Sequence, residues 1–218
     1  MNLNSPYMME HVDYYCERTG PEFWSEPINA LTNISFIIAS LVIFYLYKKE
    51  KQKDVSILIL GIMSMSVGIG SFIFHTLAIR WASLFDLLPI AIFSTYLVYL
   101  SARRSRGLSI GKSLIFLFGF FMFLGITMKF APMNILSGSL MYVPVILTVI
   151  YFAKYGKNNN KYFKLGAFFF ILSIIFRTLD SYMVGHFELG THFLWHTFNG
   201  LTFFFLMRAV MKQPKTVK

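Results

Sequence analysis

Long apolar runs alternate with short polar connections along almost the whole chain. A helix needs about 20 mostly apolar residues to cross a bilayer, and its backbone polar groups must be hydrogen-bonded within the helix. The runs that meet this length lie at about Pro27–Tyr47, Val55–Leu77, Ser83–Ser101, Leu108–Met128, Asn134–Phe152, Leu165–Val184 and Thr191–Met211. The pattern therefore predicts an all-α integral membrane protein, a bundle of seven transmembrane helices in one domain.

Basic residues gather in every second connection and at the C-terminus. They are Lys48, Lys49, Lys51 and Lys53, then Arg103, Arg104, Arg106 and Lys112, then Lys154, Lys157, Lys161 and Lys164, and finally Arg208, Lys212, Lys215 and Lys218. Because basic residues flank the cytoplasmic ends of membrane spans, these connections are predicted to lie in the cytoplasm. The N-terminus is then outside and the C-terminus cytoplasmic, which agrees with an odd number of spans.

The composition also indicates a membrane protein. Of the 218 residues, 56% are hydrophobic and 14% are charged, whereas roughly 25% of an average soluble domain is charged. The mean hydropathy is +0.59. These values exclude an ordinary globular protein, a disordered chain and a nucleic-acid-binding domain. The net charge of +10 is explained by the cytoplasmic connections. We expect no nucleic-acid partner, and nothing in the sequence implies a protein partner.

The chain is predicted to have three parts. Residues 1–26 form an acidic extracytoplasmic segment, residues 27–211 the seven-helix domain, and residues 212–218 a basic cytoplasmic tail. The start of the chain lacks the basic and apolar regions of a signal peptide, so we expect none. The single cysteine excludes an intramolecular disulfide. The charge rule fits the inner membrane of a prokaryotic cell, or an ER- or Golgi-type membrane of a eukaryote.

Ionisable residues near the outer ends of the predicted helices are candidates for function, because burying them in a membrane is costly. Ser71 and His75 are four residues apart, as are His192 and His196, so each pair shares a helix face. Three imidazoles at one depth suit a zinc site with water as the fourth ligand. Asp86, near the start of the next helix, is a candidate general base or a partner that orients a histidine. Ser71 is a candidate oxyanion donor or histidine partner.

Other interpretations of the histidines are weaker. A lone histidine in a helix is more often a packed, hydrogen-bonded residue than a ligand, but the combination of three with an intramembrane Asp favours a metal. His11, in the N-terminal segment, and His186, in a loop, are interpreted as non-ligands.

The N-terminal segment is a second candidate site. Its acidic residues are Glu10, Asp13, Glu17, Glu22 and Glu26, and Arg18 is its one Lys or Arg. Carboxylates packed in this way suit calcium, although the spacing is not that of an EF-hand. The alternatives are a solvated acidic tail, or N-capping of the first helix by Ser25 with Glu26 and Pro27 in its first turn.

Further polar residues lie within the predicted helices. Arg177 and Asp180 are three residues apart, which favours an ion pair over a substrate role. Hydrogen bonds between helices are expected from Asn29, Thr32, Asn33 and Asn199.

The order of the candidate residues resembles the alkaline ceramidase family, part of a superfamily of seven-helix membrane hydrolases that includes the adiponectin-receptor-like proteins. The pattern is a Ser and a His four residues apart on the second helix, an Asp on the third and an HxxxH pair on the seventh. Here these are Ser71, His75, Asp86, His192 and His196. Residues 15–17 and 24–33 resemble the ceramidase branch as well, and the chain is compact, like prokaryotic members.

The resemblance implies that His75, His192 and His196 hold a zinc ion. It also implies that Asp86 activates a zinc-bound water and that Ser71 stabilises the oxyanion or the zinc shell. The implied reaction is hydrolysis of the amide bond of ceramide or a related N-acyl membrane lipid. Its products are a sphingoid base and a free fatty acid, a step of sphingolipid metabolism.

The resemblance also implies a calcium ion in the N-terminal segment. Glu17 and Glu26 match two of its carboxylate ligands, and Tyr15 would offer a backbone carbonyl. Thr19 stands where the family often has Asn, and Asp13 is one residue out of step with the Asp of the family.

Three alternatives remain at this point. The chain is a lipid receptor or sensor without turnover, a hydrolase of another N-acyl or ester lipid, or a transporter of metal ions or protons. A transporter needs ionisable residues across the whole membrane depth, whereas here they lie near the outer ends.

Overall fold

A computed structural model describes residues 5–51, 53–130, 135–156 and 160–214. These residues form helices joined by short connections, and none of them belongs to a β-strand. The helices are α1 (Pro27–Thr32), α2 (Ile34–Lys49), α3 (Val55–Leu77), α4 (Arg80–Ser105), α5 (Ile110–Phe130), the 3-10 helix η1 (Ile135–Tyr142), α6 (Val143–Tyr155), α7 (Lys161–Asp180) and α8 (His192–Met211). The prediction of an all-α protein is confirmed for this part of the chain.

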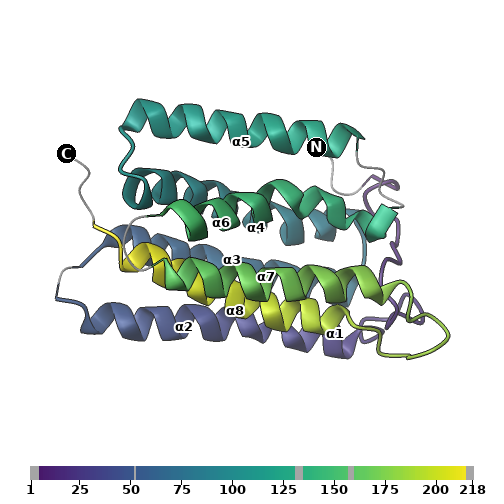
Figure 1. The fold of residues 1–218 in the computed structure, drawn as a ribbon. Coiled ribbons are helices and arrows are strands. Elements are labelled where there is room, and N and C mark those ends of the chain that lie inside the picture. Colours follow the sequence, from purple (N-terminus) through teal and green to yellow (C-terminus); the bar gives the residue numbers. More distant parts are fainter. Residues whose placement is uncertain (1–4, 52, 131–134, 157–159, 215–218) are drawn as a thin grey trace.

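The helices lie lengthwise beside one another in one bundle (Figure 1). Helix α8 packs against α7, α2, α1, α4 and α3 and is therefore the central helix. Helix α5 lies at the edge and packs against α4, α6 and η1. Its side chains Leu114, Ile115 and Phe118 are exposed. Such an apolar surface is typical of contact with lipid.

Six segments of the described chain are long and apolar enough to cross a membrane: Pro27–Lys49, Val55–Leu77, Arg80–Ser105, Ile110–Phe130, Leu136–Tyr155 and Lys161–Asp180. They correspond to the first six predicted runs, although Asn134, the predicted start of the fifth, lies outside the described residues. Helix α8 corresponds to the seventh run but does not reach the same apolarity. It buries His192, His196, Asn199 and Thr202 among its neighbours. The count of seven spans stays a prediction.

Helix α3 has its predicted bounds, whereas the other helices differ from theirs by one to several residues, most clearly α4 and α7. Helix α4 starts at Arg80, three residues before the predicted run, and continues to Ser105. Helix α7 begins at Lys161 and ends at Asp180, so it is shifted towards the N-terminus of the predicted run. Apolarity marks the part of a helix that can lie in lipid, whereas the helix itself continues into its polar ends. The residues that follow Asp180 form turns, in which Gly185 has a φ of 77°, a conformation that favours glycine.

The basic connections share one end of the bundle. The α2–α3, α4–α5 and α6–α7 connections lie there with the end of α8, and the N-terminal segment lies at the opposite end (Figure 1). This arrangement agrees with the predicted alternation of charge. Lys157, Lys215 and Lys218 lie outside the described residues. The side of the membrane that each end faces stays a prediction.

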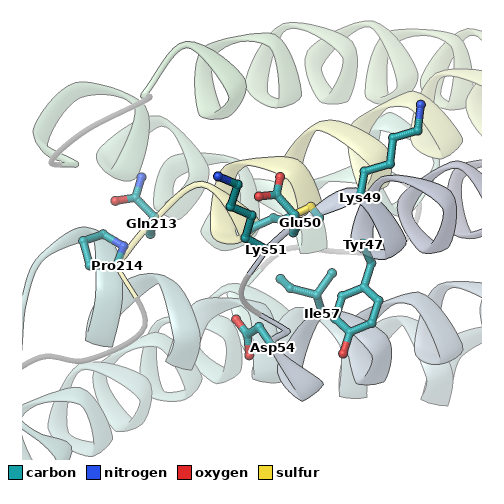
Figure 2. Close-up of a pocket in the computed structure, with 9 residues that line it drawn as sticks. Tyr47, Lys49, Glu50, Lys51, Asp54, Ile57, Gln213 and Pro214 are labelled. Atoms are coloured by element: carbon teal, nitrogen blue, oxygen red, sulfur yellow. The ribbon is translucent and has the colours of Figure 1, made fainter.

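A hollow of about 460 Å³ opens at this basic end, between the α2–α3 connection and the end of α8 (Figure 2). The acids beside it are paired, because Lys212 donates to Glu50 at 2.7 Å and Arg104 donates to Asp54 at 2.5 Å. Helix α3 starts beside the hollow and carries His75 near its other end, about 30 Å away at 1.5 Å per residue. The hollow is therefore remote from the candidate residues.

The N-terminal segment is folded against the opposite end of the bundle. The backbone N–H of Val12 donates to Ala78 at 2.8 Å, and that of Arg80 donates to Glu10 at 3.1 Å. Met8 and Val12 are buried. These contacts tie the segment to the turn between α3 and α4. The alternative of a solvated acidic tail is wrong for Glu17 and Glu26, which are buried, whereas Glu10, Asp13 and Glu22 are exposed.

Candidate metal centre

Three histidines converge where α3 ends and α8 begins. His75 lies in the last turn of α3, His192 is the first residue of α8, and His196 follows one turn later. Their side chains are almost completely buried, with 0%, 1% and 1% exposed. One ligand atom from each lies within 4.8 Å of the others, the single such grouping of potential metal ligands in the described chain. The structure therefore brings together the three predicted zinc ligands.

Two ring nitrogens of this cluster are free to bind a metal. His75 Nδ1 donates to Glu26 Oε2 at 2.7 Å, and His75 Nε2 is buried without a partner among the described residues. His192 Nδ1 is likewise buried without a partner among the described residues. His196 Nδ1 lies 3.1 Å from the hydroxyl of Thr32. A buried polar atom without a partner costs about 1–3 kcal/mol. Neutral imidazoles with free nitrogens and a carboxylate behind one of them are what a zinc site requires.

Asp180 fixes the start of α8 and with it His192. Its Oδ1 accepts the backbone N–H groups of Thr191 at 2.7 Å and His192 at 2.9 Å, and its Oδ2 accepts that of Cys16 at 2.9 Å. A carboxylate at the N-terminus of a helix satisfies otherwise unpaired donors and interacts favourably with the helix dipole. Gly190 allows this approach, because a Cβ there would lie 2.2 Å from Asp180 Oδ1.

The predicted ion pair between Arg177 and Asp180 is wrong. Among the described residues the two side chains have other partners. Asp180 caps α8, and Arg177 donates to the backbone carbonyl of Ser137 and to the hydroxyl of Ser139. Arg177 also lies over the rings of Tyr142 and Trp195, 5.4 and 5.7 Å from their centroids.

Glu17 caps α1 in the same manner. Its carboxylate accepts the backbone N–H groups of Ile28 at 2.7 Å and Asn29 at 2.8 Å. Burial raises the pKa of Glu17, and these two hydrogen bonds act in the opposite direction. The predicted cap by Ser25 is wrong, because Ser25 Oγ donates to Glu22 at 3.0 Å. Glu26 takes the N-cap position, with Pro27 next, as predicted for Pro27.

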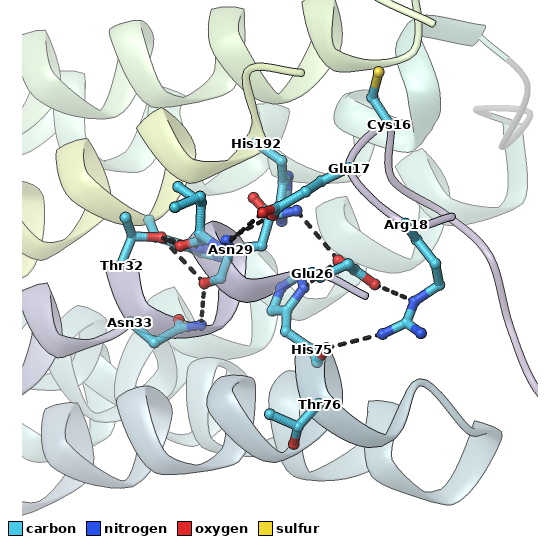
Figure 3. Close-up of polar contacts among 12 residues, drawn as sticks. Cys16, Glu17, Arg18, Glu26, Asn29, Thr32, Asn33, His75, Thr76 and His192 are labelled. Carbon is cyan, nitrogen blue, oxygen red and sulfur yellow. Dashed lines mark hydrogen bonds and ion pairs between the residues drawn. The ribbon is translucent and has the colours of Figure 1, made fainter. Parts of the chain in front are cut away.

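Glu26 links the N-terminal segment to the histidine cluster (Figure 3). One of its oxygens accepts from His75 and the other from the guanidinium of Arg18, and Asn29 Nδ2 donates to it at 3.2 Å. Burial raises the pKa of Glu26, but the hydrogen bonds from His75 and Arg18 and the charge of Arg18 outweigh it, so this pKa lies below its usual value. A charged Glu26 holds His75 in one tautomer, with its proton on Nδ1.

Tyr15 covers the cluster from the outside. Its ring stacks on His192, with centroids 3.6 Å apart and planes inclined by 21°, and lies 5.1 Å from the ring of His75. Burial raises the pKa of Tyr15, so its phenol stays neutral. Tyr15 thus covers two of the three histidines, His192 and His75.

Ser71 and Asp86 lie on two helices that approach each other closely. A Cβ at Gly70 would lie 1.8 Å from the backbone oxygen of Phe85, so only glycine fits between α3 and α4 there. Asp86 interacts electrostatically with His75 and with the hydroxyl of Ser71. Ser71 is buried and Asp86 is partly buried. The carboxylate of Asp86 therefore lies near the side chains of Ser71 and His75.

The residues predicted to bind calcium do not converge in the same way. Asp13 and Thr19 are exposed. Glu17 is occupied by two backbone N–H groups, and Glu26 by His75 and Arg18. Calcium takes six to eight oxygen ligands, and these carboxylates, as arranged, do not offer such a set. A bound calcium ion stays a prediction.

Three contributions were not found by the sequence analysis. Arg18 was counted only as a charge, Asp180 was assigned to an ion pair, and Thr32 was assigned to packing although it lies beside His196. The one signal in the sequence was that Arg18 is the single Lys or Arg of an otherwise acidic segment.

Comparison with known families agrees with this site. The family model described as Ceramidase matches residues 12–213, most of the chain, and the match spans the three histidines, Ser71 and Asp86. A comparison with curated proteins found no match. The family that the residue pattern resembles is confirmed, and the chain belongs to the ceramidase family.

Proposed function

We propose that this member of the ceramidase family is a zinc-dependent hydrolase of lipid amide bonds within the membrane. Its substrate is ceramide or a related N-acyl lipid, and its products are a sphingoid base and a free fatty acid. The observation that carries the proposal is a buried cluster of three histidines in which His75 Nε2 and His192 Nδ1 have no partner among the described residues.

His75, His192 and His196 would hold the zinc ion. Catalytic zinc sites use three protein ligands and keep one position open. Bound zinc supplies Lewis acidity, which polarises a carbonyl group and makes water a stronger acid. Glu26 contributes by fixing the tautomer of His75 through the 2.7 Å hydrogen bond to Nδ1.

Asp86 and Ser71 are proposed to act on the substrate. Asp86 is partly buried and interacts electrostatically with His75, so its carboxylate is suited to accept a proton from the attacking water and to pass it to the leaving amine. The hydroxyl of Ser71 is suited to donate a hydrogen bond to the carbonyl oxygen of the amide as negative charge develops on it.

The substrate would reach this site from the bilayer. The protein is proposed to cross the membrane seven times, with α8 enclosed by the other helices and the N-terminal segment outside. Labelling of tags tests this orientation. An N-terminal tag should react with an impermeant reagent in intact cells and a C-terminal tag should not, and the reverse pattern would contradict it.

Elemental mass spectrometry of the purified protein tests the metal site without an assumption about substrate. Wild type should contain about one zinc per chain, and His192→Ala should lose it. His186→Ala is the matched control, because His186 lies in an exposed loop. Equal zinc in wild type and His192→Ala, or none in wild type after incubation with zinc, would contradict the proposal.

A product screen then tests the reaction. Wild type should release fatty acid from ceramide, and His196→Ala should not while its helical content stays the same. An ester lipid with the same acyl chain distinguishes amide from ester hydrolysis. Zinc binding and lipid affinity without any released product would instead indicate a sensor.

A further inference from the structure

Arg18 is a buried cation at the edge of the histidine cluster. Its side chain is 3% exposed, although other residues of the same segment, such as Thr19 and Glu22, are exposed. Burial of a guanidinium is costly unless its donors are paired. Arg18 pairs them with oxygen atoms alone: the carboxylate of Glu26, the carbonyl of Gly20 at 2.8 Å and the carbonyl of His75 at 2.9 Å.

These three oxygens come from separate parts of the fold, and Figure 3 shows Arg18 with two of the residues that provide them, Glu26 and His75. Glu26 is the N-cap of α1, Gly20 belongs to the N-terminal segment, and His75 lies in the last turn of α3. The carbonyls of a last helical turn lack partners within the helix and carry partial negative charge, so they favour a cation. Arg18 therefore links the backbone carbonyl of His75 to Glu26, the carboxylate that accepts the Nδ1 proton of His75.

We propose that Arg18 is a positioning residue. Its guanidinium is the cation bound by Glu26 and the carbonyl of His75, in place of a calcium ion. The guanidinium holds Glu26 against His75, so the catalytic metal is bound without calcium. This inference rests on the proposed function, because it concerns how one zinc ligand is held.

The charges around Glu26 support a guanidinium there over a divalent ion. Glu17 is the nearest other carboxylate that was predicted to bind calcium, and both its oxygens accept backbone N–H groups of α1. A divalent cation on Glu26 would lie next to the positive charge of Arg18. The planar guanidinium fits better, since its five donors can reach a carboxylate and two carbonyls at once.

The test compares two substitutions of Arg18 with one of Arg80. Arg18→Gln removes the charge, and Arg18→Lys keeps it. Arg80→Gln is the matched control, because Arg80 also pairs with a carboxylate of the N-terminal segment, Glu10, but in an exposed position. The readouts are the zinc dissociation constant by competition with a chromophoric chelator, calcium content by elemental mass spectrometry, and thermal unfolding.

We expect wild type to contain zinc but no calcium, even after incubation with millimolar calcium. Zinc affinity should fall about 10- to 100-fold in Arg18→Gln, as is typical when a partner of a metal ligand is lost. Arg18→Lys should recover part of this loss, and Arg80→Gln should equal wild type.

One stoichiometric calcium in wild type would overturn the proposal, and this measurement needs no variant. So would wild-type zinc affinity in a folded Arg18→Gln protein. Wild type that binds no zinc would instead contradict the proposed function, and its calcium content would still decide whether Arg18 takes the place of that ion. If Arg18→Gln does not fold, Arg18→Lys provides the comparison, since zinc affinity equal to that of wild type would then exclude a role of the guanidinium geometry.

Discussion

The ring of Tyr15 lies flat against the imidazole of His192, with centroids 3.6 Å apart. The contact joins the N-terminal segment to the first residue of α8 across most of the chain. Because His192 Nδ1 has no partner in the described part of the molecule, the stack is one of the contacts that orient this ring. The N-terminal segment is thus part of the candidate metal centre as well as a cover for it.

Tyr15→Ala should weaken zinc binding, because it removes the stack and admits water. Aromatic pairs contribute about 0.5–1.5 kcal/mol beyond burial, which corresponds to about a 2- to 10-fold rise in the zinc dissociation constant. Tyr15→Phe keeps the ring and should equal wild type. Competition with a chelator measures both. A loss in Tyr15→Phe equal to that in Tyr15→Ala would show that the hydroxyl, not the ring, is the important part.

The sequence predicted part of the candidate site because the relationship within each pair of residues is local. His192 and His196 share a face through a spacing of four residues, and so do Ser71 and His75. The bounds of helix α3 were also predicted, from the apolar run Val55–Leu77. In the structure Asp54 caps its start by accepting the N–H of Ser56, and Ala78 follows its end with a φ of 46°. Helix spacing and the length of an apolar run need no knowledge of tertiary structure.

The contacts that hold these ligands in place could not be predicted in the same way. Asp180 reaches Thr191 only because of the path of the α7–α8 connection, and a spacing rule paired it with Arg177 instead. Arg18 meets the carbonyl of His75 across 57 residues. Contacts of this kind depend on how helices pack, which one sequence does not encode in any local pattern.

Asp86→Asn should slow lipid hydrolysis while zinc stays bound. Asparagine has nearly the same shape but cannot accept a proton, and general-base catalysis typically contributes about 10²- to 10⁴-fold to a rate. Turnover of ceramide and zinc content, measured on the same preparation, separate the two effects. Loss of zinc from Asp86→Asn would show that Asp86 is needed to build the site, and unchanged turnover would exclude it as the base.

Asp180→Ala should destabilise the protein and weaken zinc binding together. The substitution leaves three backbone N–H groups without their acceptor, at a cost of about 1–3 kcal/mol each where they are buried. Glu188→Gln is the control, because Glu188 is an exposed acid in the same connection. Thermal unfolding in detergent, with and without zinc, measures the effect. A variant as stable as the control would contradict the capping role.

Gly70→Ala should separate α3 from α4 and move Asp86 away from His75. The added Cβ would lie 1.8 Å from the backbone oxygen of Phe85, and backbone cannot rotate aside as a side chain can. We expect a loss of about 2–3 kcal/mol in stability, as for other overpacked sites, and a larger proportional loss of activity. Gly111→Ala, on the open face of α5, should be neutral or stabilising by up to about 1 kcal/mol. Equal effects of the two substitutions would exclude close packing at Gly70.

The pair of Asp54 and Arg104 should make stability depend on pH at the basic end of the bundle. Burial raises the pKa of Asp54, but the hydrogen bonds and charge of Arg104 outweigh it, so the pKa in the folded protein lies below its ordinary value. A carboxylate of this kind stabilises the fold above its unfolded pKa, about 3.9, and the contribution is lost as pH falls through the lower folded value.

Asp54→Asn tests this dependence, because asparagine can still cap α3 but carries no charge. Wild type should be more stable than the variant by about 1 kcal/mol at pH 7, and the difference should shrink as the pH falls below about 4. Denaturation of metal-free protein from pH 3 to 8 measures it without interference from protons that compete with zinc for the histidines. A difference that stays constant over this range would show that the charge of Asp54 does not contribute, and that its effect comes from packing or from the cap alone.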